Sequence, residues 1–123
     1  MPALLKLGHE VCRADFVSIF CQGDRDVPLL VGTDSCKGKR RAEQAAQGYN
    51  RHIDQDPNTA LLSGSKGDGD FLTHQDAADI KSFTYRRDCY DLPGIAGRIS
   101  LVRRTSTYGL SVSLYTAEET GVF

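Results

Sequence analysis

The sequence predicts an α+β fold in which helices flank a mainly antiparallel β-sheet. Two pairs of strand-like segments, residues 15–33 and 97–115, each contain a short turn, and strands joined by so short a turn must run antiparallel. Segments with helical spacing of apolar residues precede and separate these two hairpins, which excludes a parallel βαβ sheet. A chain of 123 residues is long enough for one domain with a hydrophobic core.

The first predicted elements are a helix and a β-hairpin. Apolar residues recur at helical spacing over residues 3–12, which predicts a short amphipathic helix. Residues 15–22, DFVSIFCQ, carry apolar side chains on both faces, which is typical of a strand covered on both sides. The GDRD segment at 23–26 predicts a turn, and residues 27–33 predict a second strand, with Pro28 at its start or on a sheet edge.

Two further helices are predicted in the middle of the chain. A stripe of apolar residues predicts the first over residues 39–53, and its members are Ala42, Ala45, Ala46, Tyr49 and Ile53. Residues 63–70, SGSKGDGD, form the one loop rich enough in glycine and serine to be mobile. The second helix starts near Asp76, which can cap it, and ends before the Leu-Pro-Gly sequence at 92–94.

The last hairpin, residues 97–115, separates two kinds of side chain. Tyr108, Leu110, Val112 and Leu114 alternate with Gly109, Ser111 and Ser113. We predict that the apolar face belongs to the core. The hydroxylated face either meets solvent, as half-exposed antiparallel strands do, or forms the floor of a ligand pocket. Arg103 and Arg104 stand at the strand end, where charged residues commonly keep a turn soluble, and we interpret both as surface residues of the turn.

Charge and composition narrow the class of protein. The formal net charge is −1, so no global field draws the chain to DNA or to a membrane. The four cysteines are scattered singly and no secretory signal is visible, so we expect reduced thiols in a cytoplasmic protein. No stretch approaches the length needed to span a bilayer, and we expect no membrane partner.

The sequence shows no motif for catalysis, metal binding or cofactor binding. His9, His52 and His74 stand at no metal-ligand spacing from one another, and His9 with Cys12 gives a single i, i+3 pair. The patterns of a nucleophile elbow, a zinc protease and a phosphate-binding lysine loop are absent. We therefore expect no catalytic residue, no metal and no cofactor, and classify the chain as non-enzymatic.

Three segments together carry a resemblance to a known family. They are YNRHIDQDP at 49–57, FTYRRDCYDLPGIAGRISLVR at 83–103 and GLSVSLYTAEETGVF at 109–123. They resemble the N-terminal sensory domains of LuxR-type bacterial transcription regulators, which have a GAF- or PAS-like fold. Those domains often show an aromatic-rich helix ending in Asp-Pro, a later helix with a Tyr-Arg pair, an antiparallel hairpin and a closing Gly-x-Phe. The resemblance covers roughly residues 40 to 123.

The resemblance implies a signal-sensing domain that acts as a homodimer and contacts DNA only through a fused helix-turn-helix domain absent from this chain. We expect residues 1–123 to be one sensory domain excised from a longer regulator. In the lactone-binding branch of the family, the aspartate of Asp-Pro bonds the ligand amide and a nearby tyrosine lines the pocket, which implies these roles for Asp56 and Tyr49. The chain departs from this branch because it contains no tryptophan, on which the lactone pocket normally relies.

Two functions fit these observations. The first is the non-enzymatic binding of an unknown small molecule in a pocket lined by Tyr49, Asp56, Phe83, Tyr85 and Tyr90, since each tyrosine brings apolar area and a polar tip. The second is a dimerisation module of the same fold that binds no small molecule. A buried cavity lined by Tyr49 and Asp56 favours the first function, whereas a solid core with a flat, apolar, exposed helix face favours the second.

Overall fold

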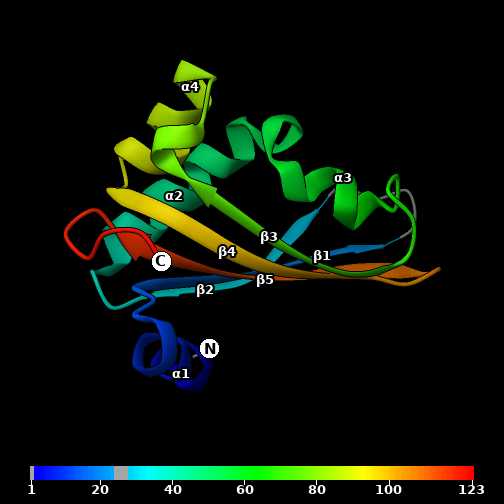
Figure 1. Cartoon of the computed structure of the whole chain (residues 1–123), viewed down its shortest axis with the longest axis horizontal. Coiled ribbons are helices and arrows are strands. Elements are labelled where there is room, and N and C mark those ends of the chain that lie inside the picture. The colour runs from blue at the N-terminus through cyan, green and yellow to red at the C-terminus, as the bar shows by residue number, and fades with distance from the viewer. Residues whose placement is uncertain (1, 24–27) are drawn as a thin grey trace.

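An antiparallel sheet forms the centre of the fold. The computed structural model describes residues 2–23 and 28–123. Its sheet has five strands in the order β2-β1-β5-β4-β3, and all neighbouring strands run antiparallel (Figure 1). The strands are β1 (Phe16–Gly23), β2 (Leu29–Ser35), β3 (Gly69–Asp76), β4 (Ile95–Arg104) and β5 (Tyr108–Ala117). The predicted α+β class, a mainly antiparallel sheet flanked by helices, is confirmed.

Helices cover the two faces of the sheet unequally. One face, which we call the inner face, carries α2, α3, α4 and the π-helical turn η3 (Figure 1). Their bounds are α2 (Lys39–Arg51), α3 (Pro57–Ser63), α4 (Phe83–Arg86) and η3 (Arg87–Asp91), with short 3-10 turns η1 (Ile53–Gln55) and η2 (Ala77–Asp79) beside them. The opposite, outer face carries only α1 (Pro2–Cys12) in the described part of the chain (Figure 1).

Most predicted elements of the first half are found near their expected places. The helices predicted at 3–12 and 39–53 are α1 and α2, and the first hairpin is β1 with β2. Pro28 directly precedes β2, an edge strand, as its missing N–H requires. Gly23 ends β1, and the other residues of the predicted turn, 24–26, lie outside the described residues.

The last hairpin buries the opposite face from the one predicted as core, so solvent contact for the hydroxylated face is wrong; that face lies beneath the helices, although its serines do not line the pocket described below. Ser100, Ser111 and Ser113 are buried on the inner face beneath the helices, and the Oγ atoms of Ser100 and Ser113 lie 2.7 Å apart. Leu101 on β4 points to the outer face and is 56 % exposed. Small side chains let the helices approach the sheet closely, and hydroxyls that bond one another can be buried without a large penalty.

The segment between α3 and β4 is also organised differently from the prediction. Residues 69–76, predicted partly as a mobile loop, form β3 and pair with β4 over their whole length. The single helix predicted from Asp76 is replaced by η2 and by α4, which begins after Ser82; the Ser82 hydroxyl accepts a hydrogen bond from the Tyr85 amide. The strand was missed because its polar alternating residues follow a glycine-rich turn and offer no apolar stripe.

The interpretation of Arg104 as a surface residue of the turn is wrong. Its side chain is 5 % exposed and donates a hydrogen bond from Nη1 to the Leu62 carbonyl, 2.8 Å away. Gly109 permits this close approach of α3, because a Cβ there would lie 2.5 Å from the same carbonyl oxygen. Arg103, by contrast, is exposed on the outer face and pairs with Asp70 at 2.8 and 2.9 Å.

None of the helices in the described ranges is long and apolar enough to cross a lipid bilayer.

Candidate functional site

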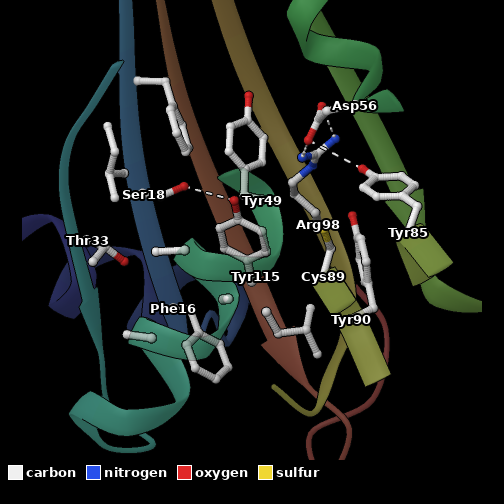
Figure 2. A pocket seen from close by; sticks show the side chains of 16 residues that line it. Phe16, Ser18, Thr33, Tyr49, Asp56, Tyr85, Cys89, Tyr90, Arg98 and Tyr115 are labelled. Atoms are coloured by element: carbon white, nitrogen blue, oxygen red, sulfur yellow. Dashed lines mark hydrogen bonds and ion pairs between the residues drawn. The ribbon is translucent and has the colours of Figure 1, made fainter. Parts of the chain in front are cut away.

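A pocket lies between α2, η3 and the inner face of the sheet (Figure 2). The volume of this cavity is about 40 Å³. That is room for about three water molecules before any side chain moves. Its lining residues are Phe16, Ser18, Phe20, Leu30, Thr33, Ala42, Ala45, Ala46, Tyr49, Asp56, Tyr85, Cys89, Tyr90, Ile95, Arg98 and Tyr115.

One side of the pocket is apolar. Phe16 and Phe20 reach it from β1, and Ile95 from the start of β4. Opposite the sheet, the stripe Ala42, Ala45 and Ala46 faces it from α2. Methyl side chains on this helix leave free space where larger residues would fill the gap between helix and sheet. The apolar stripe predicted for this helix therefore forms a pocket wall as well as a packing surface.

The other side of the pocket is polar and contains a buried ion pair. The Arg98 guanidinium on β4 donates from Nη1 to Asp56 Oδ2 at 2.5 Å and from Nη2 to Asp56 Oδ1 at 3.0 Å (Figure 2). The two side chains are 4 % and 1 % exposed. Burial alone would lower the pKa of Arg98, but the Asp56 carboxylate raises it well above its usual value. The guanidinium therefore stays charged, and the paired carboxylate compensates its charge.

Local sequence explains why Asp56 stands at this point. Asp56 is the N-cap of α3, and its Oδ1 accepts a hydrogen bond from the Asn58 amide at 2.8 Å. Pro57 follows at the first helical position, where its missing N–H costs nothing. The Asp-Pro pair thus starts a helix and fixes the carboxylate beside the sheet.

Two tyrosines and one glutamine extend the polar side. The Tyr85 hydroxyl lies 3.3 Å from Asp56 Oδ2 and 3.1 Å from Gln75 Oε1. Gln75 Oε1 also accepts from the Tyr90 hydroxyl at 2.9 Å and from Arg98 Nη2 at 3.3 Å. Burial raises the pKa of both tyrosines well above its ordinary value, so both hydroxyls remain neutral donors.

The remaining aromatic residues close the pocket between these two sides. The Tyr49 ring on α2 stacks obliquely on Phe20, with centroids 4.4 Å apart, and burial raises the Tyr49 pKa. The Tyr115 hydroxyl lies 2.8 Å from Ser18 Oγ (Figure 2). Burial, followed by the nearby Asp56 charge, raises the pKa of Cys89 to about 12, so this thiol stays protonated.

The structure brings four of the five predicted ligand-binding residues together. Tyr49, Asp56, Tyr85 and Tyr90 all line the pocket. Phe83 does not: it is 73 % exposed, and the Arg87 guanidinium lies 5.7 Å from its ring centroid. Phe83 stands at the start of α4, whose opposite side buries Tyr85, so it turns towards solvent. This placement separates Phe83 from the other predicted ligand-binding residues.

Sequence reasoning missed Arg98 and Tyr115 as pocket residues. Arg98 lies between Gly97 and Ile99 in a strand. The alternation of the residues after it predicted a hairpin and gave no reason to single out this arginine. The sequence carried no signal for its burial, because Arg98 shares the hydroxylated face of the hairpin, and packing by distant helices decides which face is buried. The partner is 42 residues away in sequence, so spacing could not identify it.

Comparisons with known proteins identify a similar structure. No family model matches the chain, and no curated protein matches its sequence. Among solved structures, the chain is similar to the crystal structure of the VqsR LBD domain from Pseudomonas aeruginosa, with a TM-score of 0.60 and 15% sequence identity. The match covers 94% of this chain and 68% of that one. At this identity the likeness supports a shared fold.

Proposed function

We propose that this protein is a regulatory domain that senses a small molecule bound between α2 and the inner face of the sheet. The pocket lined by both Tyr49 and Asp56 carries the proposal, because it combines an apolar wall with convergent polar groups, the usual form of a small-molecule site. The domain is non-enzymatic and cytoplasmic, and it passes its signal to a fused DNA-binding domain outside this chain. The fold shared with the VqsR LBD domain supports this assignment.

The charges of the pocket favour a neutral ligand. The Arg98 guanidinium and the Asp56 carboxylate form two hydrogen bonds of 2.5 and 3.0 Å and neutralise each other. Neither group therefore needs a charged group on the ligand. An uncharged molecule can place an apolar part against the α2 alanines and a polar group near the tyrosine hydroxyls. Because the free space of about 40 Å³ is small, binding of a larger molecule requires the side chains around the pocket to move.

Native mass spectrometry of the gently purified protein tests the proposal, with a variant that fills the pocket. We expect extra mass that disappears on denaturation, and at least a ten-fold lower bound fraction in Ala45→Leu. Leucine adds three carbon atoms to the α2 wall, where the ligand would lie. Ala3→Leu, at an exposed position of α1, is the matched control and should keep the extra mass. A wild-type chain without extra mass, or equal occupancy in Ala45→Leu, would contradict the proposal.

The outer face of the sheet favours a second function, self-association. Leu72, Leu101, Val112 and Ile19 are register partners from strand to strand, so they form one apolar row across four strands. Leu72 is 76 % exposed, although polar residues usually occupy the solvent face of an antiparallel sheet. Two such rows are self-complementary in a twofold dimer, because sheets can pack face to face.

Sedimentation velocity at increasing protein concentration measures this association. We expect the wild-type chain to form dimers and Leu101→Lys to remain monomeric across the same range, because the lysine charge cannot be buried in the apolar row. The control variant is Lys6→Leu, which replaces a lysine by a leucine at an exposed position of α1. It should not abolish the dimer. A wild-type monomer at every concentration would exclude this function.

A further inference from the structure

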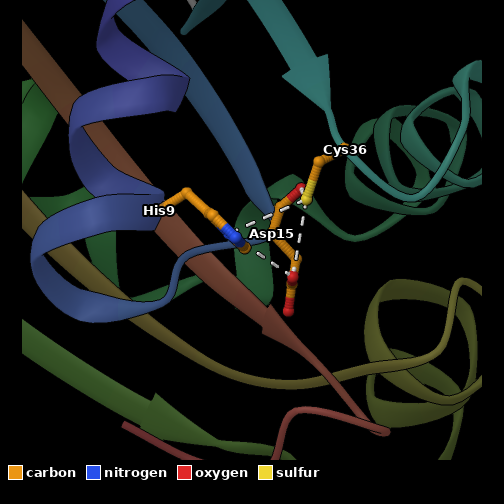
Figure 3. Close-up of side chains that lie close together, drawn as sticks. All are labelled: His9, Asp15 and Cys36. Carbon is orange, nitrogen blue, oxygen red and sulfur yellow. Dashed lines mark hydrogen bonds and ion pairs between the residues drawn. The ribbon is translucent and has the colours of Figure 1, made fainter.

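Three side chains with metal-ligating atoms meet at the edge of the outer face, away from the pocket. They are His9 on α1, Asp15 in the link between α1 and β1, and Cys36 directly after β2 (Figure 3). Asp15 is buried, whereas His9 and Cys36 are exposed. His9 and Asp15 flank the short link before β1, whereas Cys36 is 21 residues beyond Asp15, so the grouping depends on the packing of α1 against the first hairpin.

The separations of the three ligand atoms match a metal ion. His9 Nδ1 lies 3.9 Å from Asp15 Oδ1 and 4.0 Å from Cys36 Sγ, and the sulfur lies 3.5 Å from Asp15 Oδ1. A point equidistant from three atoms so separated lies about 2.2 Å from each, close to the bonds of about 2.0–2.3 Å that zinc makes to imidazole, carboxylate and thiolate ligands. That point lies in the plane of the three atoms, so a tetrahedral shell, with the ion outside this plane, requires the ligands to draw together by a few tenths of an ångström.

The backbone holds the buried ligand in position. The Asp15 amide donates to the Tyr115 carbonyl at 2.7 Å, and Asp15 Oδ2 accepts from the Ala117 amide at 2.8 Å. These bonds hold the Asp15 backbone and its Oδ2 atom against the end of β5. The other carboxylate oxygen, Oδ1, points towards His9 and Cys36 (Figure 3). The Cys36 amide donates to the Asp15 carbonyl at 2.9 Å, which ties the two ligands together through the main chain. Such support orients metal ligands in known sites.

Two neighbouring groups must adjust when a cation binds. The Lys37 ammonium lies 3.9 Å from Asp15 Oδ1, but its side chain is 31 % exposed and can turn to solvent. His9 Nδ1 lies 2.9 Å from the Ala14 carbonyl, so the ring proton must move from Nδ1 to the other ring nitrogen. The first change moves only a flexible side chain, whereas the second gives up the hydrogen bond between His9 and the Ala14 carbonyl.

We propose that His9, Asp15 and Cys36 bind a divalent transition-metal ion, with zinc the best match. The imidazole, carboxylate and thiolate give three protein ligands, and water from the exposed side completes a four-coordinate shell. The Cys36 thiol loses its proton to solvent as the metal–sulfur bond forms, so one proton is released for each ion bound. The ion connects α1 to the start of β1 and the end of β2, and thus holds α1 on the outer face.

Cobalt titration of the reduced, chelator-treated full chain tests the site. We expect one Co²⁺ per chain, a thiolate-to-cobalt charge-transfer band in the near ultraviolet, and loss of the band when zinc displaces cobalt. Cys36→Ser should abolish the band. His9→Asn, whose amide can still donate to the Ala14 carbonyl, should weaken binding of both ions at least ten-fold. Both substitutions are at exposed positions, so the variants should fold.

Matched variants separate this site from general metal binding by cysteine and histidine. Cys21→Ser on β1 and His74→Asn on β3 change residues outside the cluster and should leave stoichiometry, band and affinity unchanged. Zinc should also raise the melting temperature of the wild-type chain and of these two controls, but not that of Cys36→Ser. Cobalt binding without a thiolate band, or equal affinity in Cys36→Ser and Cys21→Ser, would overturn the proposal.

Discussion

Replacing Arg98 by methionine is expected to lower the free energy of unfolding by about 3–5 kcal/mol, because it leaves the Asp56 carboxylate buried without its ionic partner. Methionine replaces the apolar stem of Arg98 but ends where the guanidinium begins, so the loss reports the missing charge and hydrogen bonds together with the space that the guanidinium leaves. Gln75 Oε1 also loses the hydrogen bond from Arg98 Nη2. Urea denaturation of the variant and the wild-type chain measures the difference.

Two further variants test that explanation. Adding Asp56→Asn to Arg98→Met should recover a large part of the lost stability, because asparagine removes the unpaired charge and can still cap α3. Arg103→Met is the matched control on the same strand: its pair with Asp70 is exposed, and its loss should change stability little. A double variant no more stable than Arg98→Met alone would show that the buried charge is not the cause.

Replacing Gly48 by alanine is expected to destabilise the protein by about 1–3 kcal/mol, although the same change inside an exposed helix usually stabilises by about 1 kcal/mol. A Cβ at this position would lie 2.1 Å from the Asp88 carbonyl oxygen and 2.6 Å from its carbon, both backbone atoms of η3. The turn cannot easily withdraw, since the Asp88 side chain is held by His52 at 2.6 Å and by Arg87 at 2.9 Å. These two hydrogen bonds lower the pKa of Asp88 to about 2, so the carboxylate stays charged at neutral pH.

The Gly48 substitution should also change the pocket. Tyr49 on α2 and Cys89 on η3 line it and are the residues next to the contact, so α2 must shift relative to both. Urea denaturation measures the stability, and native mass spectrometry measures the fraction of the chain that carries the small molecule expected from the proposed function. Asn50→Ala, at an exposed position of the same helix, should change neither quantity appreciably. Unchanged or increased stability in Gly48→Ala would mean that α2 and η3 are not packed as closely as described.

Local patterns were sufficient for many of the elements. The helical stripe from Ala42 to Tyr49 predicted α2, and the alternation after Gly97 predicted β4 and β5. Asp56, Tyr49, Tyr85 and Tyr90 line one pocket; the first two were named through the family resemblance and the two others as aromatic residues of a predicted helix, and none through spacing. The strand β3 was not recognised, because its pairing with β4 stabilises a sequence that has little apolar alternation of its own.

The sequence by itself determined the order of most elements, the antiparallel hairpins and the apolar stripe along α2, because these depend on neighbours within a few residues. The tertiary structure alone decided which face of the sheet is buried, because the buried face is the one against which helices from other parts of the chain pack. It likewise paired Arg98 with Asp56 and brought His9, Asp15 and Cys36 together. Such pairings depend on three-dimensional packing between segments remote in sequence, and no local spacing records them.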